Sequence, residues 1–244
     1  MTVVFTERPS PNWNERREGA CPDMVILHYT GMHSATSAIE RLSNPGAKVS
    51  SHYVIDQAGR IIRLVDESRR AWHAGVSFWR GDTDINSRSI GIELVNRGHA
   101  HGYSEFPEMQ MQALILLLEG ICVRHRIPAR HILAHSDVAP ARKKDPGERF
   151  DWQRIWRAGF GVWVPPAPIL SAPAPARTES TTAGVQLALA EIGYGVKGSG
   201  RYDQPTVDAI TAFQRHWRPS LVDGQTDAST LDTLARVNAA WKQE

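Results

Sequence analysis

The sequence predicts an α/β protein with a mixed central β-sheet flanked by helices, followed by a small C-terminal bundle of three helices. In the first part of the chain, short apolar runs of strand length alternate with helical patterns. In the last part, apolar residues recur only at helical spacing. Between the two lies a stretch rich in Pro, Ala and Ser, which is typical of a semi-rigid extended linker. We therefore divide the chain into a larger domain over residues 1–163, a linker over 164–182 and a small domain over 183–244.

Five apolar runs predict the strands of the sheet: residues 24–30, 51–55, 60–65, 89–96 and 131–135. The second and third flank the four residues Asp-Gln-Ala-Gly, whose length and composition suit a β-hairpin. The remaining strands are separated by longer connections that leave room for helices, so a mixed sheet is expected.

Helical patterns account for the rest of the predicted structure. Residues 107–127 are apolar on a wide face and predict a long buried helix. Asp151 is expected to cap a short helix over 152–158 that ends at Gly159. The three helices of the tail are marked by apolar residues at helical spacing, namely Val185, Leu189 and Ile192, then Val207, Ile210, Phe213 and Trp217, then Leu231, Leu234 and Val237.

The composition excludes several functional classes. The 28 basic and 26 acidic residues leave a net charge of +2, which is too balanced for a nucleic-acid-binding surface. The short basic runs, Arg69-Arg70 and Arg142 to Lys144, are expected to be solvated loop charges. The two cysteines, Cys21 and Cys122, are too few for a disulfide framework or a cysteine-based zinc knot.

The chain shows no sign of a membrane span or a signal peptide. The first twenty residues are dotted with charges, and the longest apolar run, Ala113 to Leu118, is too short to cross a bilayer. We therefore expect a cytoplasmic protein without membrane association if Met1 is the native start, and a periplasmic one if the N-terminus was trimmed.

The segment AHSDVAPARKKDPG, residues 134–147, has a spacing that fits neither a helix nor a strand. A catalytic zinc ion requires three protein ligands and one open position for water. His135 and Asp145 are candidate ligands if a turn at Ala139-Pro140 folds the chain back, and His28 at a predicted strand end could supply the third. The alternative is structural, because a histidine at a strand end usually packs and an aspartate before proline often forms a turn.

Five blocks together resemble the zinc-dependent N-acetylmuramoyl-L-alanine amidases of the AmpD and AmiD type. They are LHYT, SSHYVID, RAWHAGVSFW, SIGIELVN and AHSDVAPARKKDPG, and they occur in the order of that family over residues 20–163. The tail, particularly residues 202–231, resembles the three-helix peptidoglycan-binding domain that often accompanies such amidases. The resemblance implies the fold of these amidases and of the related peptidoglycan recognition proteins.

The resemblance also assigns roles to individual residues. It implies that His28, His135 and Asp145 bind Zn²⁺, and that Glu93 is the catalytic carboxylate. Lys143 matches the lysine that stabilises the oxyanion of the tetrahedral intermediate. Four further residues match positions around the cleft, where substrate contact and structural support are equally expected: His52, Trp72, His73 and Asn86.

The implied reaction is hydrolysis of the amide between the lactyl group of N-acetylmuramic acid and L-alanine of the stem peptide. Zinc would activate water, and Glu93 would take its proton and pass it to the leaving amine. A cytoplasmic enzyme would meet soluble muropeptides returned for recycling, including the anhydro form, and the tail would then serve packing, dimerisation or substrate gating. Two alternatives remain open: a non-catalytic peptidoglycan-binding protein of the same fold, and a zinc peptidase that cuts within the stem peptide.

Overall fold

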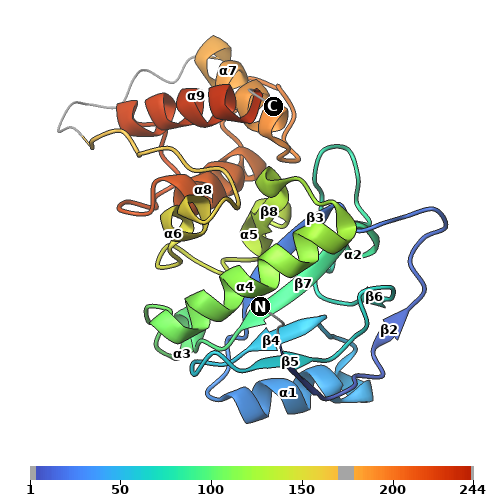
Figure 1. Ribbon diagram of the computed structural model, residues 1–244. Helices are drawn as coiled ribbons and strands as arrows, with labels where there is room; N and C mark the ends of the chain where they lie inside the picture. Colours follow the sequence, from blue (N-terminus) through green and yellow to red (C-terminus); the bar gives the residue numbers. More distant parts are fainter. Residues whose placement is uncertain (1–3, 170–178, 243–244) are drawn as a thin grey trace.

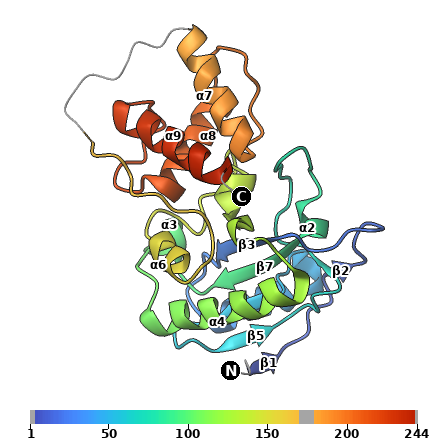
Figure 2. The same cartoon turned by 45° about the horizontal axis from the view of Figure 1, so that its top comes forward.

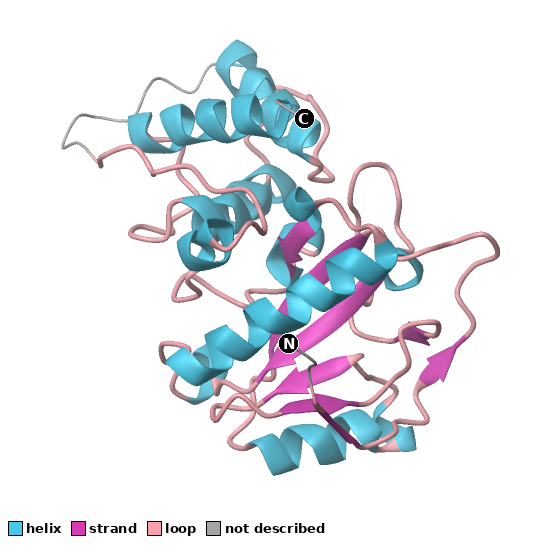
Figure 3. Ribbon diagram, in the orientation of Figure 1, coloured by secondary structure: helices cyan, strands magenta, loops and turns pink. Residues whose placement is uncertain are grey.

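A six-stranded mixed β-sheet forms the centre of the N-terminal part in the computed structural model, which describes residues 4–169 and 179–242 (Figure 3). Only β4 and β5 pair antiparallel, as the predicted hairpin requires, and all other neighbours in this sheet are parallel. Across the sheet, the strands are β1 (Phe5–Glu7), β5 (Ile61–Arg63), β4 (Tyr53–Ile55), β7 (Ser89–Leu94), β3 (Met24–Tyr29) and β8 (Ile132–Ala134). A separate antiparallel ribbon joins β2 (Trp13–Asn14) to β6 (Arg70–Ala71).

Helices connect the strands and form the tail. In the N-terminal part they are α1 (Ala35–Ser43), η1 (Pro45–Ala47), α2 (Ile85–Arg88), α3 (Gly98–His101), α4 (Glu108–His125), η2 (Ala129–His131), α5 (His135–Val138) and α6 (Trp152–Arg157). The tail contains α7 (Glu179–Ile192), α8 (Gln204–Trp217) and α9 (Ala228–Lys242). No helix among the described residues is long and apolar enough to span a membrane.

The two faces of the sheet are covered by different helices. Alternate residues of a strand point to opposite faces, and Val25 and Leu27 of β3 pack with α4 in the largest apolar cluster. Met24 and Ile26 point the other way, into a cluster shared with the tail helices. Figures 1 and 2 show α4 across one face of the sheet, and Figure 1 shows the tail helices on the side of β8, with α8 nearest to it and α7 and α9 farther out. His28 follows Ile26 by two residues and points to the same side as Met24 and Ile26, so its side chain lies on the face opposite α4.

The predicted fold class is confirmed, with differences in individual elements. The long helix and the helix capped by Asp151 are present, and the Asp151 side chain accepts a hydrogen bond from the backbone N–H of Arg154. The predicted strand over 131–135 is wrong at both ends, because His131 belongs to η2 and His135 begins α5. The reason is local: the Asp137 carboxylate accepts a hydrogen bond from the backbone N–H of Ala134, which starts a helical turn directly after the strand.

The tail is packed into the molecule. Its first helix begins at Glu179, inside the segment predicted as linker. Ala167, near the other end of that segment, is buried against α9, where its N–H donates to Thr233 Oγ1 and its carbonyl accepts from Ser229 Oγ. The middle of the predicted linker lies outside the described residues. A cluster of buried apolar side chains that combines Ile26 and Leu133 of the sheet with Leu189 of α7 joins the tail to the sheet.

Candidate metal centre and active-site cleft

Two parallel strands at the centre of the sheet carry the first two site residues. His28 on β3 pairs in register with Glu93 on the neighbouring β7. Ile92 and Leu94 pack with α4, so Glu93 between them points to the same face as His28. His28 and Glu93 therefore stand side by side at the carboxyl ends of β3 and β7.

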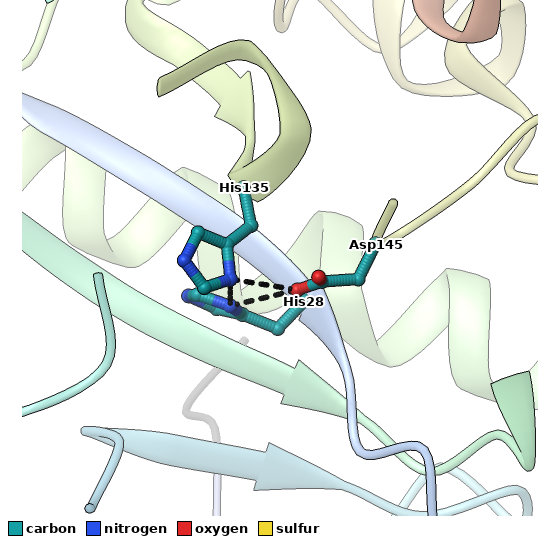
Figure 4. Close-up of side chains that lie close together, drawn as sticks. All are labelled: His28, His135 and Asp145. Carbon is teal, nitrogen blue, oxygen red and sulfur yellow. Dashed lines mark hydrogen bonds and ion pairs between the residues drawn. The ribbon is translucent and has the colours of Figure 1, made fainter. Parts of the chain in front are cut away.

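His28, His135 and Asp145 converge on one point (Figure 4). The two Nδ1 atoms are 2.8 Å apart, and Asp145 Oδ2 lies 3.0 Å from His28 Nδ1 and 2.9 Å from His135 Nδ1. Ligand atoms arranged tetrahedrally around zinc at its usual bond lengths are separated by about 3.3 Å, so only a slight widening would admit the ion. All three side chains are buried. The cluster fits a metal ion with two nitrogen ligands and one oxygen ligand.

Hydrogen bonds behind the cluster orient both imidazoles. His135 Nε2 lies 3.0 Å from the carbonyl of Ala74, to which it donates. His28 Nε2 lies 3.0 Å from His73 Nδ1, and His73 Nε2 lies 3.2 Å from Ser89 Oγ. With N–H groups on each Nε2, the Nδ1 lone pairs of His28 and His135 face inward, which is the tautomer that a metal requires.

Burial keeps the imidazoles of His28 and His73 neutral. It lowers the pKa of His28 to about 4, and the neighbouring His135 acts in the same direction, while Asp145 partly opposes both. Burial also lowers the pKa of His73 well below its usual value. Asp145 is affected oppositely: burial raises its pKa, but His135 and His28 outweigh this and hold the pKa well below the usual value. Neutral imidazoles and an ionised carboxylate are the protonation states that bind a divalent cation.

The cluster forms one wall of a cleft of about 600 Å³. Glu93, Lys143, Trp72 and His73 also line this cleft, whereas His52 and Asn86 do not. Glu93 Oε2 is buried and has no hydrogen-bond partner among the described residues. Burial, assisted by the charge of Asp145, raises the pKa of Glu93 well above its usual value. The cleft therefore brings an unpaired carboxylate close to a candidate metal ion.

His52 and Asn86 support the cleft from behind. The Asn86 side-chain oxygen accepts hydrogen bonds from the backbone N–H groups of His73 and Ala74, and so fixes the carbonyl that receives His135. His52 accepts from the N–H of Gly91 and contacts the Arg69 carbonyl through Nε2. Burial, together with the charge of Arg16, lowers the pKa of His52 to about 3.

Two of the three basic residues near Asp145 differ from the expectation of a solvated run, whereas Lys144 is exposed as expected. Arg142 is anchored, because its guanidinium donates to the carbonyls of Ala74 and Val76. Lys143 is partly buried at the cleft, and its ammonium forms no salt bridge with any residue that the structure describes. The expectation is also wrong for Arg70, which bonds to the carboxylate of Asp84.

Sequence reasoning also missed three residues near the site, namely the pair Tyr29 and His99 and the carboxylate Asp137. Tyr29 and His99 line the cleft, and the tyrosine hydroxyl lies 3.0 Å from His99 Nδ1. Asp137 is fully buried on α5 beside His135. Asp137 follows the candidate ligand His135 by two residues. Its side-chain partners Tyr194 and His216 lie far away in the sequence, so no local pattern indicates its role.

A buried cluster of two histidines and one aspartate, open to a cleft and next to an unpaired carboxylate, is the arrangement of a metal-dependent hydrolase. The chain matches the family described as N-acetylmuramoyl-L-alanine amidase over residues 18–148, and a peptidoglycan binding domain family over residues 180–234. The chain therefore belongs to the N-acetylmuramoyl-L-alanine amidase family, and it is an enzyme of that activity.

Individual relatives agree with this assignment. AmiD of Escherichia coli strain K12 is 38% identical over 222 residues, which cover 85% of this chain and 79% of that protein. A structure of E. coli AmiD with its substrate anhydro-N-acetylmuramic acid-L-Ala-D-γ-Glu-L-Lys is 34% identical, with a TM-score of 0.78 and 94% of each chain covered. AmpDh3 from Pseudomonas aeruginosa is 26% identical, with a TM-score of 0.75 and 98% of each chain covered.

Proposed function

We propose that the enzyme uses zinc, held by His28, His135 and Asp145, to release the stem peptide from muropeptides, including those with the anhydro sugar. The observation that carries this proposal is the convergence of three buried ligand atoms within 4.8 Å of one another at the wall of a cleft. The anhydro substrate in the AmiD complex supports the substrate class. When bound, the ion supplies Lewis acidity, which makes water a nucleophile near neutral pH.

The residues around the cluster would divide the remaining work. Glu93 Oε2, which is buried without a hydrogen-bond partner among the residues that the structure describes, would accept the proton of the attacking water and return it to the leaving amine. Lys143 would donate to the oxygen of the scissile carbonyl as negative charge develops on it. Both side chains line the cleft, so both can reach a bound amide.

Residues around the cleft would differ in their contact with substrate. Trp72 and His73 line the cleft, and Trp72 is partly exposed there as a flat apolar surface. His52 and Asn86 would act through the segments they hold, Gly91 for the first and His73-Ala74 for the second. The tail over residues 183–244 would form a three-helix domain that packs against the sheet, and its match over residues 180–234 supports affinity for peptidoglycan fragments. A cytoplasmic location stays a prediction, which fractionation of the native protein would check.

Incubation with a defined anhydromuropeptide tests the proposal. Mass spectrometry should show free stem peptide and the anhydro sugar when zinc is present, and neither product after chelation. The Glu93→Gln variant should bind zinc but release almost no peptide. A shortened peptide still attached to the sugar would instead identify a peptidase, and an unchanged substrate would contradict cleavage of this class of muropeptide.

A further inference from the structure

A buried carboxylate joins the tail to the segment that carries His135. Asp137 lies on α5 and is completely buried. Its Oδ2 accepts from the backbone N–H of Ala134 at 2.8 Å and from His216 Nδ1 at 2.7 Å, and its Oδ1 accepts from the hydroxyl of Tyr194 at 2.7 Å. Two of these three donors belong to the tail, because Tyr194 follows α7 and His216 lies on α8.

Both tail donors are held firmly in place. The His216 ring is stacked between Trp152 and Trp217, with 3.6 Å between ring centroids on each side. The Tyr194 ring packs edge-on against Trp79 at 5.3 Å. A buried carboxylate is costly unless hydrogen-bond donors surround it. Without the tail donors, Asp137 would keep only the Ala134 N–H among the three and would turn toward water.

The turn fixed by Asp137 carries one candidate ligand and is hydrogen-bonded to the segment that holds two further site residues. His135 is the first residue of the turn. The next residue, Ser136, donates its N–H to the carbonyl of Asp145 at 3.0 Å, which links the backbones of two candidate ligands. The carbonyl of Ala139, directly after the turn, accepts from the N–H of Lys143 at 3.0 Å. Any rotation of this turn would therefore displace one candidate ligand directly and another through its backbone.

We propose that Tyr194 and His216 of the C-terminal helices are positioning residues for the metal centre, acting through Asp137 on the turn that carries His135. The tail is then part of the catalytic apparatus as well as a domain that contacts peptidoglycan. A structure of AmpD covers 65% of this chain and 99% of its own, so family membership by itself does not require a tail. The requirement for the tail arises from the contacts of Asp137 in this chain. The zinc-affinity measurement that tests it rests on the proposed zinc site.

The test removes the two donors while keeping the aromatic packing. The double variant Tyr194→Phe/His216→Phe retains both rings and loses both hydrogen bonds to Asp137. Its zinc affinity, measured by competition with a chelator, should fall by about tenfold or more, the usual effect of losing outer hydrogen bonds to a metal site. In the metal-free protein, the amides of residues 133–139 should exchange hydrogen faster than in the wild type. His216→Asn, which keeps an N–H donor near the Nδ1 position, should recover part of the affinity relative to His216→Phe.

Val237→Ala is the matched control, because Val237 is buried in the same tail core but has no polar group for Asp137. It should lower the melting temperature without changing zinc affinity or the exchange of residues 133–139. The proposal is overturned if the double variant keeps wild-type affinity and exchange, or if the control loses as much affinity at equal loss of stability. Should the wild type bind no zinc, the metal assignment fails, and the exchange rates of residues 133–139 still decide the role of the tail.

Discussion

At the scale of single residues, the site depends on groups that orient the candidate ligands. His73 and the carbonyl of Ala74 each receive one imidazole N–H, and Asn86 holds the backbone of both. Arg142 adds a second donor to the Ala74 carbonyl. These contacts set the direction of both imidazoles, because each hydrogen bond fixes the orientation of a neighbouring ring or carbonyl.

Lys143→Ala should lower kcat by about a hundredfold, because a donor to the developing oxyanion is lost from the cleft. Zinc content should not change, since Lys143 is not among the candidate ligands. Steady-state kinetics and metal analysis of the purified variant measure both quantities. Lys197→Ala, at an exposed lysine of the tail, controls for the loss of one positive charge. Wild-type turnover in Lys143→Ala would contradict the assigned role.

At the scale of elements, a second, partly buried carboxylate ties the long helix to the hairpin. Glu67, in the loop after β5, accepts hydrogen bonds from Tyr53 of β4 and from Arg124 and His125 at the end of α4. Burial raises the pKa of Glu67, but the hydrogen bonds from Arg124, Tyr53 and His125 outweigh it and lower the pKa to about 2. This carboxylate therefore stabilises the folded protein in its ionised form.

Glu67→Gln should lower the free energy of unfolding at pH 7 by about 3 kcal/mol, the value of a pKa lowered from 4.5 to about 2. The contribution of Glu67 is complete above the unfolded pKa of 4.5 and is lost as the pH falls toward 2, so variant and wild type should converge in that range. Urea unfolding at pH 7 and pH 3 measures the difference. Glu119→Gln, at an exposed position on α4, should have little effect. An equal difference between variant and wild type at both pH values would show that the lowered pKa of Glu67 is not its cause.

At the scale of the whole molecule, the tail and the sheet share one apolar cluster. Trp79 is buried in it, with its ring 5.3 Å from Tyr194 and 6.2 Å from Trp241. The N–H of Arg80, the next residue, donates to the carbonyl of Gly193. Such a shared interior favours unfolding of both parts in one transition.

Trp79→Ala should destabilise the protein by about 3–5 kcal/mol, because it leaves a large cavity at this shared interior. A calorimetric scan of the wild type should show one transition, and the variant should show that transition at lower temperature. Val123→Ala on the exposed face of α4 provides a control that leaves the interior intact. Two wild-type transitions, with only one of them moved in the variant, would show that the tail unfolds independently.

Metal removal should also be visible in the stability of the whole chain. A ligand present at a hundred times its dissociation constant stabilises the folded state by about 2.7 kcal/mol. For a chain of this size, chelation should therefore lower the melting temperature by about 5–10 °C, and added zinc should restore it. The Asp145→Asn variant should melt at the same temperature with and without the chelator. A wild-type melting temperature that does not change when the chelator is added would contradict a metal site of this affinity.

The predictable part of the fold comes from long or strongly patterned segments. Helix α4 was expected because its apolar residues cover a wide face, and β3 and β7 because they are continuous apolar runs. The short strands β1, β2 and β6 were missed, since two or three residues carry no periodic signal. Helix α1 was missed although Ala35, Ala38, Ile39 and Leu42 stand at helical spacing after the N-cap Ser34, so the sequence did carry a signal for it.

The sequence by itself determined the types of chemical group at the site, because the blocks around His28, Glu93 and AHSDVAPARKKDPG are contiguous and their spacing is visible in the chain. The roles assigned to these residues stay proposals. Only the tertiary structure decided which atoms face one another: His28 meets His135 and Asp145, and Asp137 meets Tyr194 and His216. The physical reason is that a hydrogen bond or a metal site depends on distances of a few ångströms between residues far apart in sequence. The segment that first suggested a site therefore has two sides, one facing a candidate metal ion and the other facing the tail.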